Sequence, residues 1–209
     1  MNSKELYNDI NHHLLNDKKP SVYLNSIYNN SLLKAHPFNM LYNLKKAEQS
    51  PVHHPEGNVW NHTVMVVDQA AKIKDKSKNP SVFMWAALLH DIGKPSTSKI
   101  RKGKIISYNH DSVGSTLARE FLSFFTDDQE FINEVVQLVR YHMQILFVVK
   151  NMPFADIDDM KKNTDIYEIA LLGFCDRMGR TNSDLKAEEG NIRVFLNKTG
   201  GKKSFSLLD

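Results

Sequence analysis

A run of apolar residues from Val82 to Leu89 leads directly into the adjacent pair His90 and Asp91. Such a run predicts a buried helix, and Gly93 followed by Pro95 predicts that the helix ends just beyond it. A buried, unpaired polar group costs several kcal/mol, so this histidine and this aspartate must have partners. Because an imidazole and a carboxylate are both good ligands for divalent cations, the segment predicts metal-competent side chains at the edge of the core.

The composition is that of an ordinary globular protein with room for one sizeable core in 209 residues. A net charge of +3 is too small to require a nucleic-acid partner by itself. The single cysteine, Cys175, excludes an internal disulfide and a multi-cysteine zinc site, and it is typical of a reducing compartment. The N-terminus does not resemble a signal peptide, and no apolar stretch reaches the roughly 18 residues that span a bilayer. We therefore expect a cytoplasmic protein without membrane contact.

Helix-period spacing of apolar residues dominates the chain and predicts an all-α fold. The predicted helices cover residues 3–16, 21–33, 38–49, 62–74, 79–91, 110–125, 128–146 and 164–180, with a short turn of helix at 156–160. Asn61 is a candidate N-cap, 50–57 is a loop, and the basic segment 95–108 allows a small hairpin around Gly103. We expect an N-terminal helical extension at 1–49, a helical bundle at 50–182, and a C-terminal segment at 183–209 that is mobile from Thr199 to Lys203.

Four of the predicted helices place one metal-competent side chain in line with their apolar residues, since positions three, four and seven apart share one side of a helix. Together with the doublet they give four imidazoles and two carboxylates: His62, His90, Asp91, His110, His142 and Asp176. Five separate segments each place a polar side chain on an otherwise apolar face, and this pattern is hard to explain if those side chains are simply solvated. The set is large enough for one cation, or for two cations bridged by a carboxylate.

Each member also has a simpler interpretation. A lone inward histidine is more often a hydrogen-bonded core residue than a ligand, and the whole set could form a polar core network. Asp176 could pair with Arg177 or Arg180, as neighbouring charges on a helix do. His54 and Glu56 precede His62 and could support it from outside the cluster. The lysine-rich segment 99–104 is either a solvated loop or a rim that attracts an anionic substrate.

The order of these residues resembles that of the HD-domain superfamily of metal-dependent phosphohydrolases. The family pattern is a histidine, a His-Asp doublet and a later aspartate, which here are His62, His90-Asp91 and Asp176. The doublet and its successors through Lys94 resemble the HDIG subtype, and His110 and His142 occupy the places of the two extra histidines of two-metal members. The surrounding segments are similar to the HD domain of bacterial CCA-adding tRNA nucleotidyltransferases: 54–63, 108–114, 138–143 and 175–180.

This resemblance implies an HD-domain helical bundle that hydrolyses a phosphate ester with one or two divalent ions, of Mn, Fe, Ni, Co, Mg or Zn. Asp91 would bridge the ions at the catalytic centre, and Lys94, with Arg177 and Arg180, would balance the charge of the bound phosphoryl group. The expected substrate is a small-molecule phosphate ester, in the first place a nucleotide, with an RNA end carrying a 2′,3′-cyclic phosphate as an alternative. We expect no CCA addition, because residues 1–49 show no nucleotidyltransferase motif. A non-catalytic module that senses a nucleotide or docks a partner is a further alternative.

Overall fold

The computed structural model describes residues 1–201 and 205. It confirms an all-α fold, with one small hairpin as its regular β-structure among these residues. The first helical elements are α1 (Ser3–Asn16), α2 (Pro20–Ile27), the 3-10 turn η1 (Ser31–Lys34), α3 (Asn39–Tyr42), η2 (Asn43–Lys46), α4 (Val59–Ile73), η3 (Lys74–Lys76), α5 (Pro80–Leu89) and α6 (Lys94–Thr97). The hairpin strands β1 (Lys99–Arg101) and β2 (Lys104–Ile106) follow, then α7 (His110–Ser123), α8 (Gln129–Tyr141), α9 (Gln144–Val149), α10 (Ile157–Asn163), α11 (Ile166–Met178) and α12 (Leu185–Thr199). Within the described residues, none of these helices is long and apolar enough to cross a membrane.

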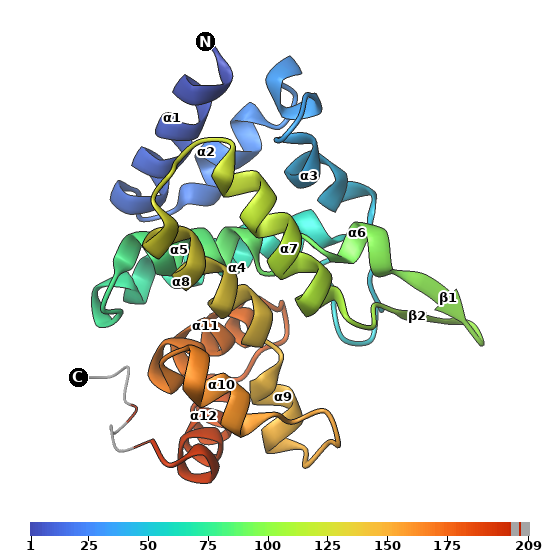
Figure 1. Cartoon of the computed structure of the whole chain (residues 1–209). Helices are drawn as coiled ribbons and strands as arrows, with labels where there is room; N and C mark the ends of the chain where they lie inside the picture. Colours follow the sequence, from blue (N-terminus) through green and yellow to red (C-terminus); the bar gives the residue numbers. More distant parts are fainter. Residues whose placement is uncertain (202–204, 206–209) are drawn as a thin grey trace.

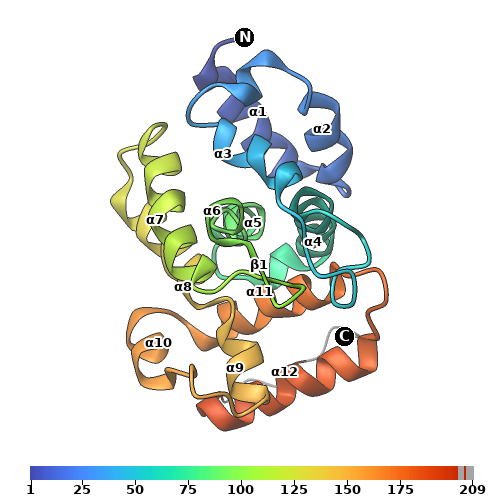
Figure 2. The same cartoon turned by 90° about the vertical axis from the view of Figure 1, so that its right-hand side faces the viewer.

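Helix α5 is the centre of the bundle. Its residues from Val82 to Leu89 are all buried, as expected for a helix that is apolar on every side. Asn79 begins the helix by accepting a hydrogen bond from the backbone N–H of Val82, and Pro80 occupies the first turn. Helices α1, α4, α8 and α11 pack around α5, which Figure 2 shows end-on in the middle of the molecule. The C-terminal end of α5 therefore delivers the His-Asp doublet into the interior.

The N-terminal helices share this core. Helices α1 and α2 pack on α5 and α4, and Figure 1 shows them as a layer above those two helices. The ring of Tyr7 stacks on Trp85 of α5, with 4.8 Å between centroids, and on Phe125, at 4.6 Å. The two buried tryptophans also hold this layer, because Trp85 donates its ring N–H to Asn11 and Trp60 donates to Asn25, each at 2.9 Å.

Several boundaries differ from the sequence-based expectation. Helix α4 begins at Val59, because the side chain of Asn58, not Asn61, caps it. The predicted helix 128–146 is divided, since α8 ends at Tyr141 and α9 begins at Gln144. At that division the His142 ring donates to the Val139 carbonyl, which competes with the regular helical hydrogen bond to that oxygen. The helices predicted over 21–33 and 38–49 are shorter and continue as 3-10 turns. The hairpin is confirmed, with Ile100 opposite Ile105.

Helix α12 was not among the helices predicted from the sequence. Asp184 caps it, and Gly200 ends it in a left-handed conformation with φ 78°. Ile192, Phe195 and Leu196 are buried along one side, and the helix packs on α9 and α11. Thr199, where the mobile end was expected to begin, is buried in the last turn of the helix, whereas Lys202 and Lys203 lie outside the described residues.

Candidate metal centre

Five segments bring the six predicted ligands together in the interior. His62 lies on α4, the doublet directly follows α5, His110 opens α7, His142 directly follows α8, and Asp176 lies on α11. Each of the six residues is at most 8% exposed. The side chains that helix periodicity placed inward are thus buried, and the structure brings them close together.

The carboxylate of Asp91 lies between two groups of ring nitrogens. On one side, its Oδ2 atom lies 3.3 Å from His90 Nε2 and 3.9 Å from His62 Nε2. On the other side, its Oδ1 atom lies 3.4 Å from His110 Nε2 and 3.8 Å from His142 Nε2. The ligand atoms of each group, with Asp91 counted in both, lie within 4.8 Å of one another, which is compact enough to hold a metal ion.

Hydrogen bonds at the opposite ring nitrogens fix the tautomers of three histidines. Nδ1 of His90 lies 2.9 Å from the carbonyl of Ala87, and Nδ1 of His110 and of His142 each lie 2.7 Å from a carbonyl three residues earlier. A carbonyl oxygen only accepts, so each Nδ1 carries the hydrogen and each neutral ring presents a lone pair at Nε2. Three lone pairs thus point toward the Asp91 carboxylate.

Two of these lone pairs face each other with no hydrogen between them, although the Lys94 ammonium reaches Asp91 Oδ2. The Nε2 atoms of His110 and His142 are 3.2 Å apart, and Nε2 of His90 is buried with no hydrogen-bond partner among the described residues. A lone pair opposite a lone pair or a carboxylate needs a cation between them. The donor set of imidazole nitrogens and carboxylate oxygens therefore fits divalent metal ions on either side of Asp91.

Protonation preferences in the cluster follow from burial and from neighbouring charges. Burial alone would raise the pKa of Asp91, but the nearby ammonium of Lys94 outweighs it and holds that pKa well below its usual range. Burial, reinforced by the neighbouring His110 and His90, lowers the pKa of His142 to about 4, and burial also lowers the pKa of His110. The carboxylate is therefore ionised and these two rings are neutral at pH 7, the states in which they bind metal.

His62 is held between carboxylates on both sides of its ring. Nε2 lies 3.0 Å from Asp176 Oδ1, and Nδ1 lies 2.9 Å from Glu56 Oε1. Burial lowers the pKa of His62, but the bonds to Asp176 and Glu56 outweigh that effect and raise it. Glu56 also contacts Nδ1 of His54 at 2.9 Å, so it orients His62 from outside the cluster as metal-ligating histidines commonly require.

Lys94 is buried beside the cluster. Its ammonium lies 2.7 Å from Asp91 Oδ2 and donates to Gln49 Oε1 at 2.7 Å. Gly93 lets this turn approach α7, since a Cβ at Gly93 would lie 2.2 Å from the carbonyl oxygen of His110. Lys94 thus lies next to the predicted metal ligands. Gln49, which was not predicted from the sequence to belong to the site, helps to hold the Lys94 ammonium there.

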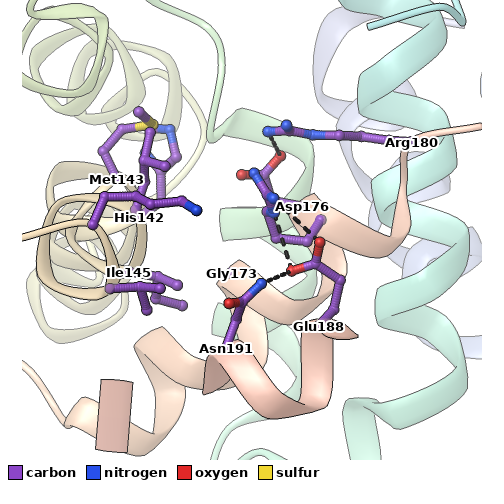
Figure 3. A pocket seen from close by; sticks show the side chains of 12 residues that line it. His142, Met143, Ile145, Gly173, Asp176, Arg180, Glu188 and Asn191 are labelled. Carbon is purple, nitrogen blue, oxygen red and sulfur yellow. Dashed lines mark hydrogen bonds and ion pairs between the residues drawn. The ribbon is translucent and has the colours of Figure 1, made fainter. Parts of the chain in front are cut away.

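The two arginines of α11 have different surroundings. A guanidinium nitrogen of Arg180 lies 3.6 Å from Asp176 Oδ1, whereas Arg177 is bound by both oxygens of Glu188 on α12, at 3.1 and 3.2 Å. Figure 3 shows Asp176, Arg180 and Glu188 at a small cavity that Arg177 also lines. The cavity has a volume of about 40 Å³, which has room for a few water molecules only. Arg177 therefore anchors α12 and is not free to bind a substrate. This contact depends on α12, which was not predicted from the sequence.

A much larger cleft opens over the cluster. It has a volume of about 1350 Å³, and Asp91, Lys94, His110, His142 and Asp176 all line it. Its rim includes Asp111 and Arg140, which form an ion pair at 2.9 Å. Asp111 also lies in the first turn of α7, where a negative charge is favourable. The hairpin side chains of Lys99, Arg101, Lys102 and Lys104 are exposed near this opening, where Ile105 lines the cleft.

A helical bundle with a buried His/Asp cluster under an open cleft is an arrangement that could hold metal ions. Residues 59–147 match the family model described as "HD domain". This stretch of the chain is therefore similar to an HD domain. His62, the doublet, His110 and His142 lie within the matched residues, and Asp176 lies beyond them.

The chain is also similar to parts of several curated proteins. The chain is 34% identical over 110 residues to a multifunctional CCA protein of Actinobacillus pleuropneumoniae serotype 5b, which covers 50% of this chain and 24% of the relative. It is 27% identical over 183 residues to the multifunctional CCA protein of Mannheimia succiniciproducens, and this match covers 83% of the chain and 42% of the relative. It is 33% identical over 100 residues to a CC-adding tRNA nucleotidyltransferase of Thermus thermophilus, covering 47% and 22%. The chain spans less than half the length of these relatives.

Proposed function

We propose that this protein is a metal-dependent phosphohydrolase that acts on a nucleotide or a related phosphate ester. The observation that carries the proposal is the position of Asp91, whose two oxygens face two separate groups of histidine nitrogens under an open cleft. A carboxylate in that position is suited to bridge two cations. The similarity to an HD domain supports the reaction class.

The six ligands divide into two sets in this proposal. His62, His90 and Asp176 would hold a divalent cation with Asp91 Oδ2, and His110 and His142 would hold a second with Asp91 Oδ1. When bound, such ions make hydroxide available near neutral pH and neutralise phosphoryl charge. The ligand set has nitrogen and oxygen donors, which suit Mn, Fe, Ni, Co, Mg or Zn.

The cationic side chains would position the substrate. Lys94 is the cation nearest to Asp91, and it would leave this carboxylate for a phosphoryl oxygen when metal ions neutralise the site. Arg180 would contact a phosphoryl oxygen from the Asp176 side. Arg177 is committed to Glu188, so we assign it a role in holding the α11–α12 wall.

A test of the reaction class uses substrates without a base. Protein loaded in turn with Mn²⁺, Fe²⁺, Ni²⁺, Co²⁺, Mg²⁺ and Zn²⁺ should hydrolyse an aryl phosphate or a bis-aryl phosphodiester with at least one of them. The His90→Ala variant should lose bound metal and turnover together. The matched control is His12→Ala, which removes an exposed histidine of α1 and should change neither. Full turnover by metal-free His90→Ala protein would end the proposal.

A non-catalytic role is the competing function. In that case the metal would be structural, and the cleft would sense a nucleotide or dock a partner. Retained metal and tight nucleotide binding without turnover of any ester would favour this role. An RNA end with a 2′,3′-cyclic phosphate is the alternative substrate, and the exposed basic hairpin and the tRNA-modifying relative are consistent with it. Binding of RNA that weakens steeply with salt would favour that substrate over a mononucleotide.

A further inference from the structure

The cleft is larger than its catalytic end requires. The candidate ligands occupy one part of the lining, and the remainder continues along residues 105–113 and 143–159. A phosphoryl group with its metal ions would leave much of about 1350 Å³ unfilled. The substrate therefore extends beyond its phosphate, and the lining of the outer part shows what chemistry that extension has.

Exposed aromatic side chains gather at this outer part. Within the described residues, three large aromatic residues are more than half exposed: Tyr108 at 61%, Phe154 at 59% and Phe124 at 55%. Tyr108 and Phe154 line the cleft, whereas Phe124 does not. They belong to separate walls, since Tyr108 follows β2 and Phe154 lies between α9 and α10. An exposed aromatic ring is costly to leave in water, and two of them on one cleft indicate a ligand with a flat apolar face.

The main chain around Phe154 is held in place despite the exposure of the ring. The buried side chain of Gln144 donates to the Phe154 carbonyl at 3.4 Å and accepts from the Asp156 N–H at 2.9 Å. Phe147 of α9 lies edge-on to Phe154, with 5.6 Å between ring centroids, and it also lines the cleft. A ring with a fixed backbone and a packed edge is pre-organised to stack on a ligand at low entropic cost.

The cleft lining carries five basic side chains and five aspartates. Lys94, Arg140 and Arg180 are ion-paired with aspartates of the lining, whereas the ammonium of Lys150 has no ion-pair or hydrogen-bond partner in the described chain and is available to a phosphate. Cations complement phosphate, and aromatic rings complement a base, so this combination matches a nucleotide and not a bare phosphate or a sugar phosphate. We infer that Phe154, supported by Phe147 and Gln144, forms with Tyr108 a stacking site for the nucleobase of the substrate. The inference rests on the proposed function for the position of the phosphate.

Equilibrium binding to Mn²⁺-loaded protein tests the base site without requiring turnover. The ligands are AMP, CMP, GMP and UMP, with ribose 5-phosphate as the ligand that lacks a base. Wild-type protein should bind the nucleotides at least tenfold more tightly than ribose 5-phosphate. The Phe154→Ala variant should bind AMP about 5- to 150-fold more weakly, the range that loss of base stacking produces. Its affinity for ribose 5-phosphate should stay within about twofold of wild type.

Matched variants separate stacking from general damage. Phe124→Ala removes an equally exposed ring outside the cleft and should leave both affinities unchanged. Phe154→Trp keeps a stacking surface and should restore AMP binding. Equal affinity of wild type for AMP and ribose 5-phosphate, or unchanged AMP affinity in both Phe154→Ala and Tyr108→Ala, would overturn the inference. Base-dependent binding in a protein that hydrolyses no ester would support the base site while refuting the proposed function.

Discussion

The middle of helix α5 and the two residues that follow the helix have opposite kinds of surroundings. In the middle of the helix, Trp85 stacks on Tyr7 and lies in an aromatic cluster with Phe121 and Phe125. Immediately after the helix, His90 and Asp91 are as deeply buried but lie beside ring nitrogens, carboxylate oxygens and the Lys94 ammonium. Burial at the first place is favourable because apolar area leaves water, whereas burial at the second needs compensating charge. One helix thus carries both the core and the site.

From this comparison we expect that removing the charge of Asp91 impairs metal binding and activity at the site and leaves the packing of the aromatic core in place. The Asp91→Asn variant should retain less than half of the bound metal and lose activity by about 1000-fold or more, because an amide cannot bridge two cations. The metal-free variant should also be about 3–5 kcal/mol less stable, since the buried Lys94 ammonium loses its partner. Elemental analysis, ester turnover and urea unfolding measure these three effects. Normal metal content in the variant would contradict the bridging role.

The reverse change should damage the core and spare the site. Trp85→Ala removes a fully buried ring, its stacking on Tyr7 and its bond to Asn11, so we expect a loss of about 3–5 kcal/mol in the free energy of unfolding. The metal content of each folded molecule should be unchanged. Val52→Ala, at an exposed position, is the control and should cost little. A Trp85→Ala protein that folds but cannot bind metal would show that metal binding depends on the packing of the aromatic core around Trp85.

Orientation of one ligand should have a smaller effect than loss of the bridge. Glu56→Gln keeps the size of the side chain next to His62 and removes its charge. We expect metal affinity to fall about 10- to 100-fold, because His62 is then held less firmly and is a weaker base. Competition with a metal-sensitive dye measures the affinity. Glu120→Gln, on the exposed side of α7, is the matched control, and equal affinities of the two variants would remove Glu56 from the site.

The contrast also explains which features the sequence could predict. Inward positions of His62, His110 and Asp176 follow from helix period alone, because each interrupts an apolar face. Their meeting at one point follows from all five segments sharing a single core. The link between Arg177 and Glu188 could not be predicted, since it requires α12, whose sequence is mostly polar. The caps at Asp184 and Gly200, with apolar residues at 192, 195 and 196, were the signal that could have identified this helix.

The smallest expected effect is on the pH dependence of stability, through Tyr7 in the aromatic cluster around Trp85. Burial, with a minor contribution from Asp128, raises the pKa of Tyr7 to about 12 from an ordinary value near 10. A raised pKa in the folded state means that its contribution to stability is complete below about pH 10 and is lost as pH rises toward 12. Metal-free wild type should therefore lose more stability between pH 9 and 11 than Tyr7→Phe, which has no phenol to ionise. Tyr28 and Tyr141 have similarly raised pKa values, to about 12, so the difference is only one part of the alkaline loss. Urea unfolding at both pH values measures it, and parallel losses in the two proteins would show that the Tyr7 phenol ionises as freely in the folded chain as in the unfolded one.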